Sequence, residues 1–194
     1  MIVAALGDSI TAGSPLWDPD AGVRARIGEA LDERSQWPYW AARRHPGLQF
    51  RNCGVHGERT DEIAARLEAC AVGAGALVIQ GGINDIAQRR PVEAAAASLR
   101  GMVRRGRELG LRVAVADVLP WNAGGPERVQ PILELNRLVA ALALEEEVSL
   151  LRFHDTLLDP GRPGCMREEW VSDGDHPSVE GYGRLGELAF VPPR

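Results

Sequence analysis

The sequence predicts a single α/β domain in which helices cover both faces of a five-stranded parallel sheet. Short apolar runs of strand length alternate along the chain with longer segments of helical periodicity. Alternating strands and helices form parallel sheets, because each helix carries the chain back to begin a parallel neighbour. The 194 residues are 45% hydrophobic and 25% charged, which fits one globular domain spanning residues 1–194.

Continuous apolar runs predict the strands, as is typical of strands buried on both faces of a sheet. We expect strands at residues 2–6, 48–55, 76–80, 112–119 and 148–153. We expect helices at residues 22–34, 37–44, 60–70, 91–109, 126–147 and 178–189.

Several predicted helices are bounded by residues suited to helix ends. Pro38 lies in a first turn, where its missing N–H is tolerated. Thr60 is a capping residue, and Asp61 follows it where the helix dipole favours an acid. Gly110 ends the fourth long helix, and Pro131 is an alternative start for the fifth.

Polar and glycine-containing segments follow the predicted strands at their carboxyl ends. They are residues 7–11 (Gly-Asp-Ser-Ile-Thr), 52–57, 81–85, 120–122 and 173–176. In open parallel sheets, ligands bind beyond the carboxyl ends of the strands. We therefore expect these segments to form one site at one edge of the sheet.

The residues gathered there are those that acyl transfer requires. A serine hydroxyl such as Ser9 is a weak nucleophile until a base removes its proton, and His176 can be that base. Asp173, three residues earlier, can orient the imidazole and stabilise its charged form. The backbone N–H groups of Ser9 and Gly54 and the side-chain amide of Asn84 are available to stabilise the oxyanion.

These segments resemble the four sequence blocks of the GDSL/SGNH hydrolase family, in the family's order and from end to end of the chain. Ser9, Gly54, Asn84 and His176 match the four residues that give SGNH its name, and Asp173 matches the third member of the triad. The resemblance implies a flavodoxin-like α/β/α sandwich. It also implies an esterase, lipase or thioesterase activity that uses no metal and no cofactor.

Neighbouring residues have simpler interpretations. Asp8 is interpreted as a brace for the turn around Ser9, and Asp85 as a similar support for the loop of Asn84. Asp175 is an alternative to Asp173 as the carboxylate partner of His176. It is adjacent to His176 in the sequence, so the side chains of Asp175 and His176 should point in different directions. His56 either borders the pocket or lies on the surface. Cys53 is expected to be a buried, inert thiol.

Three tryptophans, Trp17, Trp121 and Trp170, lie on loops that could reach the site. They are candidates for the walls of a compact substrate pocket, and the alternative is that each covers the edge of the core. The spare segments 12–36 and 155–171 contain few large apolar residues. We therefore expect short acyl groups, acetyl to butyryl. A thioesterase or lysophospholipase and a carbohydrate acetylesterase are the alternatives.

Composition argues against several other classes of protein. The formal net charge of −5 disfavours a nucleic-acid binder. Three cysteines at these spacings suggest neither a disulfide framework nor a zinc site. No predicted segment is a leader or a membrane span, so we expect a cytoplasmic protein acting on a small-molecule ester. A non-catalytic binding module on the same fold is the second functional class, and the sequence carries no signal for an oligomeric state.

Overall fold

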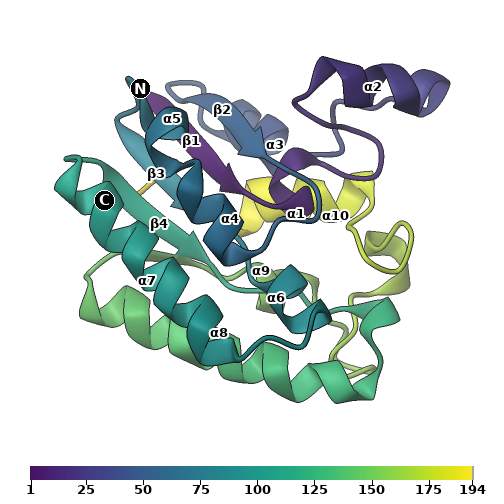
Figure 1. Cartoon of the computed structure of the whole chain (residues 1–194). Coiled ribbons are helices and arrows are strands. Elements are labelled where there is room, and N and C mark those ends of the chain that lie inside the picture. Colours follow the sequence, from purple (N-terminus) through teal and green to yellow (C-terminus); the bar gives the residue numbers. More distant parts are fainter. Residues whose placement is uncertain (194) are drawn as a thin grey trace.

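The computed structural model describes residues 1–193, and these form the three layers expected, with a parallel sheet between two layers of helices (Figure 1). The strands are β1 (Ile2–Gly7), β2 (Gln49–Gly54), β3 (Ala76–Ile79), β4 (Arg112–Ala116) and β5 (Ser149–Leu151). Their order in the sheet is β2-β1-β3-β4-β5, and every pairing is parallel. This is the flavodoxin-like order, in which the strand sequence reverses between β1 and β3.

Ten α-helices lie in the described part of the chain. They are α1 (Ser9–Ala12), α2 (Ala21–Ile27), α3 (Trp37–Arg44), α4 (Thr60–Ala65), α5 (Leu67–Ala71), α6 (Ile83–Ala87), α7 (Val92–Glu108), α8 (Val129–Glu145), α9 (Phe153–Leu157) and α10 (Val179–Arg184). A π-helical turn, Leu185–Ala189, extends α10. The α8 helix begins at Val129, so Pro131 lies in its first turn instead of starting it.

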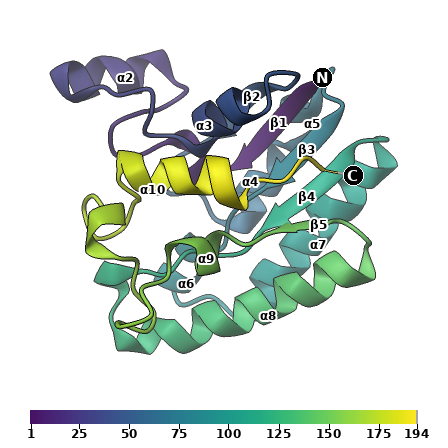
Figure 2. The same ribbon diagram turned by 180° about the vertical axis from the view of Figure 1, so that it is seen from behind.

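Two cores hold the layers together, because successive strand residues point to opposite faces of the sheet. On one face, Ala4 and Leu6 of β1 pack with side chains from α4, α5, α7 and α8. On the other face, Val3 and Ala5 pack with α3, α9 and α10 (Figure 2). Trp37 of α3 is fully buried in this second core. The near-continuous apolar strands are explained by this burial on both faces.

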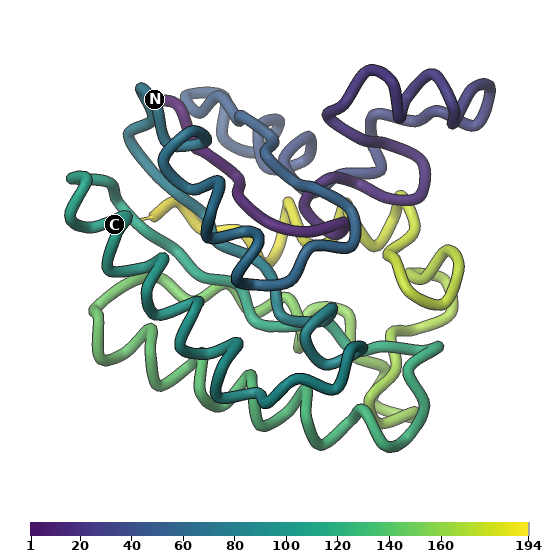
Figure 3. Tube along the Cα trace, in the orientation of Figure 1, coloured from purple at the N-terminus to yellow at the C-terminus, as the bar shows by residue number. Residues whose placement is uncertain are grey.

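Two expected helices differ from the prediction, and the short helices α1, α6 and α9 were not expected. The helix expected from residue 60 to 70 is divided into α4 and α5 at Arg66, whose φ of −99° and ψ of −3° depart from ideal α-helical values. The segment 18–34 forms an arm that carries α2 and extends from the body of the molecule (Figure 3). No residue of α2 is buried.

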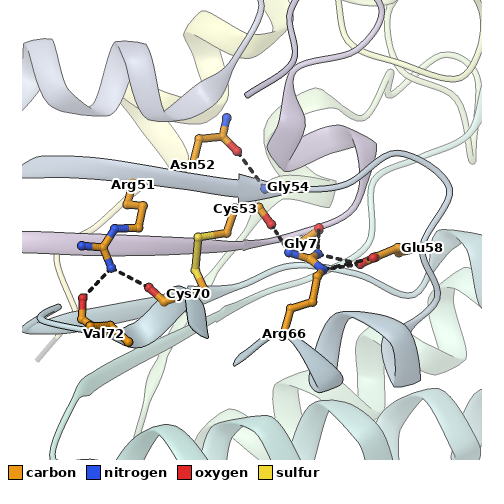
Figure 4. The surroundings of a disulfide bond; sticks show 9 residues. All are labelled: Gly7, Arg51, Asn52, Cys53, Gly54, Glu58, Arg66, Cys70 and Val72. Carbon is orange, nitrogen blue, oxygen red and sulfur yellow. Dashed lines mark hydrogen bonds and ion pairs between the residues drawn. A yellow bond between two sulfur atoms is a disulfide. The ribbon is translucent and has the colours of Figure 1, made fainter. Parts of the chain in front are cut away.

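The cysteine prediction is wrong, because Cys53 and Cys70 form a disulfide (Figure 4). The bond joins β2 to α5 across a sequence separation of 17 residues. Cys53 is therefore not a free thiol, and Cys165 is the free cysteine. Because disulfides are rare in reducing compartments, cysteine usage no longer supports the expectation of a cytoplasmic setting.

No helix within residues 1–193 has both the length and the hydropathy needed to cross a bilayer.

Candidate active site

Ser9 lies at the start of α1, directly beyond the carboxyl end of β1. Asp8 is the N-cap of this helix, and its Oδ1 accepts the N–H of Ile10 at 2.9 Å. The carboxyl group is fully buried, and burial raises its pKa to about 6 although the Ile10 hydrogen bond lowers it. The expectation that Asp8 braces the turn around Ser9 is thus met by this hydrogen bond.

A chain of three polar groups ends at the Ser9 hydroxyl. Ser9 Oγ lies 3.0 Å from His176 Nε2, and His176 Nδ1 lies 2.8 Å from Asp173 Oδ2. A carboxylate only accepts hydrogen bonds, so Nδ1 carries the proton and Nε2 is free to accept the proton of the serine. Both Ser9 and His176 are buried. The sequence separation of 167 residues is bridged by the fold.

Asp173 is held as a carboxylate beside the imidazole. Burial alone would raise its pKa, but the His176 ring and the backbone N–H groups of His176 and Asp175 donate to it and hold the pKa below its usual value. The rival, Asp175, points elsewhere, since its Oδ1 accepts the indole N–H of Trp121 at 2.6 Å. The geometry therefore favours Asp173 as the partner of His176.

Asn84 is positioned by α6, which follows β3. Its Nδ2 donates to the carbonyl of Glu58 at 2.9 Å, and this leaves the second hydrogen of the amide for another acceptor. The next residue, Asp85, is buried and accepts both the backbone N–H and the hydroxyl of Thr60. Asp85 thus fastens α6 to the start of α4 and supports Asn84, as expected from the sequence.

Gly54 does not have the environment that the sequence suggested. Its N–H donates to the side chain of Asn52 at 2.9 Å, and therefore it is not available to an oxyanion. A Cβ on Gly54 would lie 2.0 Å from the backbone nitrogen of Ala12, so glycine is required here for close packing of β2 against α1. The assignment of Gly54 as an oxyanion donor is accordingly corrected.

Gly57 is a functional candidate that sequence reasoning missed. It lies in the exposed turn after β2, at a positive φ of 79°, with nothing within 4 Å of an added Cβ. Within residues 1–193 its N–H has no acceptor, and neither does the N–H of Ser9. The sequence signal that could have distinguished the two glycines is Asn52. An Asn side chain commonly accepts the N–H of the residue two positions later, which here is Gly54.

His56, from the same turn, borders the site. Its ring centre lies 5.8 Å from that of His176, and its Nδ1 lies 3.4 Å from the Ser14 hydroxyl. His56 lines a groove of about 560 Å³, and Asp20 and Val23 of the arm and Arg66 also contribute to its lining. Of the two readings of His56, the structure favours the one at the edge of a pocket.

The three tryptophans have different environments. Trp170 is buried in the second core, where the Arg184 guanidinium lies 3.9 Å from its ring centre, so its prediction as a pocket wall is wrong. Trp121 is half-buried and holds Asp175 through its indole N–H. Trp17, directly before the arm, is half-buried beneath the Arg24 guanidinium of the arm. A large aromatic ring on a loop was an unreliable indicator of substrate contact.

The fold is a doubly wound α/β sheet that places Ser9, His176 and Asp173 in contact beyond the carboxyl ends of its strands. The sequence model of the GDSL-like Lipase/Acylhydrolase family matches residues 5–184. The chain belongs to this family, and it is a carboxylic ester hydrolase of the GDSL type. No curated protein matches the chain significantly in sequence.

Solved structures share the whole fold at low sequence identity. A protein assigned to the lipolytic G-D-S-L family from Desulfitobacterium hafniense DCB-2 is 24% identical, with a TM-score of 0.78 and coverage of 96% of this chain and 95% of its own. The lipase/acylhydrolase from Enterococcus faecalis is 23% identical, with a TM-score of 0.74 and coverage of 96% and 92%. The W215I variant of Axe2, an acetyl xylan esterase from Geobacillus stearothermophilus, is 18% identical, with a TM-score of 0.68 and coverage of 95% and 90%.

Proposed function

We propose that the protein hydrolyses carboxylic esters through an acyl-enzyme, with Ser9 as nucleophile, His176 as base and Asp173 as the residue that orients His176. The observation that carries this proposal is the unbroken chain of contacts from Asp173 through His176 to Ser9, at 2.8 and 3.0 Å. A protein that only bound esters would have no need of a base beside a buried serine.

The proposed reaction has two halves. His176 Nε2 takes the proton of Ser9 as Oγ attacks the ester carbonyl, and the alcohol leaves with that proton as the tetrahedral intermediate collapses. Water then attacks the acyl-serine with the same base, and the carboxylic acid and the free serine are released. Asp173 stabilises the imidazolium in both halves, which its lowered pKa permits because it stays ionised.

We assign the oxyanion contacts to three donors, with Gly57 in place of Gly54. They are the N–H of Ser9, the N–H of Gly57 and the second hydrogen of the Asn84 amide. Two of these have no other acceptor in residues 1–193, and the third belongs to a side chain whose other hydrogen is bound to Glu58. Donors fixed before the reaction stabilise developing negative charge without reorganisation.

For the acyl group we retain the proposal of acetyl to butyryl esters. The groove beside His56 is lined by charged side chains (Asp18, Asp20 and Arg66) as well as by Val23 and Val55, which suits a short or polar group more than a long alkyl chain. A carbohydrate acetylesterase is the second candidate, supported by the acetyl xylan esterase that shares the fold. A thioesterase or lysophospholipase remains the alternative for long chains.

Covalent labelling tests the proposed mechanism and separates it from a binding module. A fluorophosphonate should label the folded protein once, at Ser9, and nitrophenyl acetate should be hydrolysed. Labelling should disappear in Ser9→Ala. A folded wild-type protein that is neither labelled nor active would contradict the proposed function and favour a binding module.

A further inference from the structure

Arg66, between α4 and α5, is the centre of a hydrogen-bond cluster behind the active-site turn (Figure 4). Its Nε and Nη2 donate to the Glu58 carboxylate, with a shortest distance of 2.6 Å. Nη1 donates to the carbonyl of Cys53 at 2.7 Å, and Nη2 also donates to the carbonyl of Gly7 at 3.1 Å. One guanidinium therefore joins three segments: the end of β1, the end of β2 and the turn that follows β2.

Those three segments carry or orient the proposed oxyanion donors. Gly7 ends β1 two residues before Ser9, and Cys53 lies at the end of β2, where the turn begins. Glu58 directly follows Gly57, and its carbonyl accepts the amide of Asn84. A displacement of Glu58 would thus move the Gly57 N–H and release Asn84 from its orientation.

The turn has little packing of its own to fix it. Val55, His56 and Gly57 are all exposed. By contrast, the side chains of Arg66 and Glu58 are only 27% and 18% exposed, and their contact is bidentate. A planar guanidinium fork matched to a carboxylate restricts direction as well as distance, which an ammonium group does not.

We infer that Arg66, acting through Glu58, is a positioning residue that aligns the Gly57 N–H and the Asn84 amide with the transition state. This inference rests on the proposed function, since it concerns the same reaction. Arg66 also lines the groove beside His56, but Arg66→Lys keeps the positive charge there and removes only the guanidinium fork, and Glu58 is not part of the groove lining. Loss of the alignment should therefore lower kcat while KM changes little, because the oxyanion exists only in the transition state.

Arg66→Lys is the test, and Arg51→Lys is its matched control. Arg51 also links β2 to α5, through bonds to the carbonyls of Cys70 at 2.8 Å and Val72 at 2.5 Å, but it has no contact with the turn. For Arg66→Lys we expect kcat for nitrophenyl acetate to fall roughly 10- to 100-fold, with KM within about threefold of wild type. Affinity for a boronic acid, which forms a tetrahedral adduct with a serine, should fall in parallel. Arg51→Lys should keep kcat within about twofold of the wild-type value. It should lower the thermal midpoint about as much as Arg66→Lys does.

Glu58→Gln provides a second variant that keeps the bonds of Arg66 to Cys53 and Gly7, in case Arg66→Lys fails to fold. It should also lower kcat, and the double variant should lose no more than the more damaging single variant, because the two side chains act as a unit. If the wild type is active but both variants match Arg51→Lys in kcat, this inference alone is overturned. If the wild type itself neither hydrolyses esters nor reacts with a fluorophosphonate, the proposed function is overturned together with it.

Discussion

The roles of single residues around Ser9 can be separated by substitution. Ser9→Ala or His176→Ala should lower kcat by about 10⁴-fold or more, because nucleophile and base act together. Both side chains project from the ends of elements whose cores they do not build, so the fold should survive. Hydrolysis of nitrophenyl acetate measures the loss, and circular dichroism checks the fold. Ser149→Ala, at the start of β5 and the opposite edge of the sheet, is the control. Near-normal activity of Ser9→Ala would refute the assignment.

Gly54 and Gly57 should respond differently to replacement by alanine. Gly54→Ala places a Cβ 2.0 Å from the Ala12 nitrogen, so we expect a large fall in the thermal midpoint. Gly57→Ala meets open space, and its positive φ should cost only about 1–2 kcal/mol of stability. Its kcat should nevertheless fall by at least about tenfold, because the N–H is displaced. Unchanged kcat in a folded Gly57→Ala variant would show that groups other than the Gly57 N–H stabilise the oxyanion.

A buried carboxyl group outside the site should make stability depend on pH. Burial raises the pKa of Asp117 from 3.8 to about 7, although the His154 N–H that it accepts lowers it. The folded state then binds the proton more tightly than the unfolded state, so stability falls as pH rises from about 4 to about 7. The full loss is of the order of 4 kcal/mol.

Asp117→Asn keeps an acceptor for the His154 N–H and removes the charge. The variant should be more stable than wild type at pH 8, and the difference should vanish toward pH 4. Urea unfolding at several pH values measures this, with the exposed Glu29→Gln as a control. A constant difference between wild type and Asp117→Asn across that range would contradict the expectation.

At the residue scale, sequence reasoning succeeded where a residue type and its place at a strand end agreed. Ser9, Asp173 and His176 were brought together as expected. It failed where two residues of the same type lay three positions apart, as Gly54 and Gly57 do, because the choice depends on which N–H already has a partner. The prediction that Trp170 lines the pocket was wrong for a related reason. Whether a side chain is buried depends on tertiary packing, which the sequence of a loop does not show.

Among the elements, the connection between β2 and α5 is the part that the sequence did not reveal. The Cys53–Cys70 disulfide depends on a strand end and a helix being adjacent in space, and periodicity within either element gives no sign of it. Where α4 and α5 are divided, the Arg66 guanidinium donates to carbonyls at the ends of β1 and β2, a tertiary contact that helical periodicity does not show. Strands and long helices were predictable because their apolar patterns are local.

Removal of this disulfide should destabilise the protein. Closing a loop across 17 residues constrains the unfolded chain, and the effect is about 3 kcal/mol for loops of this length. For Cys53→Ala/Cys70→Ala we expect the thermal midpoint to fall by roughly 10 °C. A reductant should lower the wild-type midpoint by a similar amount and leave the double variant unchanged. Cys165→Ala is the control, and a wild type insensitive to reductant would contradict the pairing.

At the scale of the whole molecule, the hollows of the surface bear on the length of the acyl chain. The hollow lined by Ala140, Leu144, Val148 and Val191 has a volume of about 620 Å³, but it lies where β5 begins, at the opposite edge of the sheet from Ser9. The groove that reaches His56 has Asp18 and Asp20 in its wall. Charged side chains therefore interrupt the apolar lining of this groove.

Chain-length dependence of hydrolysis should reflect this arrangement. Each CH₂ group that is buried contributes about 0.8 kcal/mol, so an enzyme with a long apolar channel gains about fourfold in kcat/KM per carbon until the channel ends. Here we expect kcat/KM for nitrophenyl esters to rise no further than butyryl and to be lower for octanoyl. Val23→Asp, which places a charge in the groove, should weaken the preference for butyryl over acetyl, whereas the exposed Val72→Asp should not. A maximum at eight carbons or beyond would overturn the short-acyl proposal and favour a thioesterase or lysophospholipase.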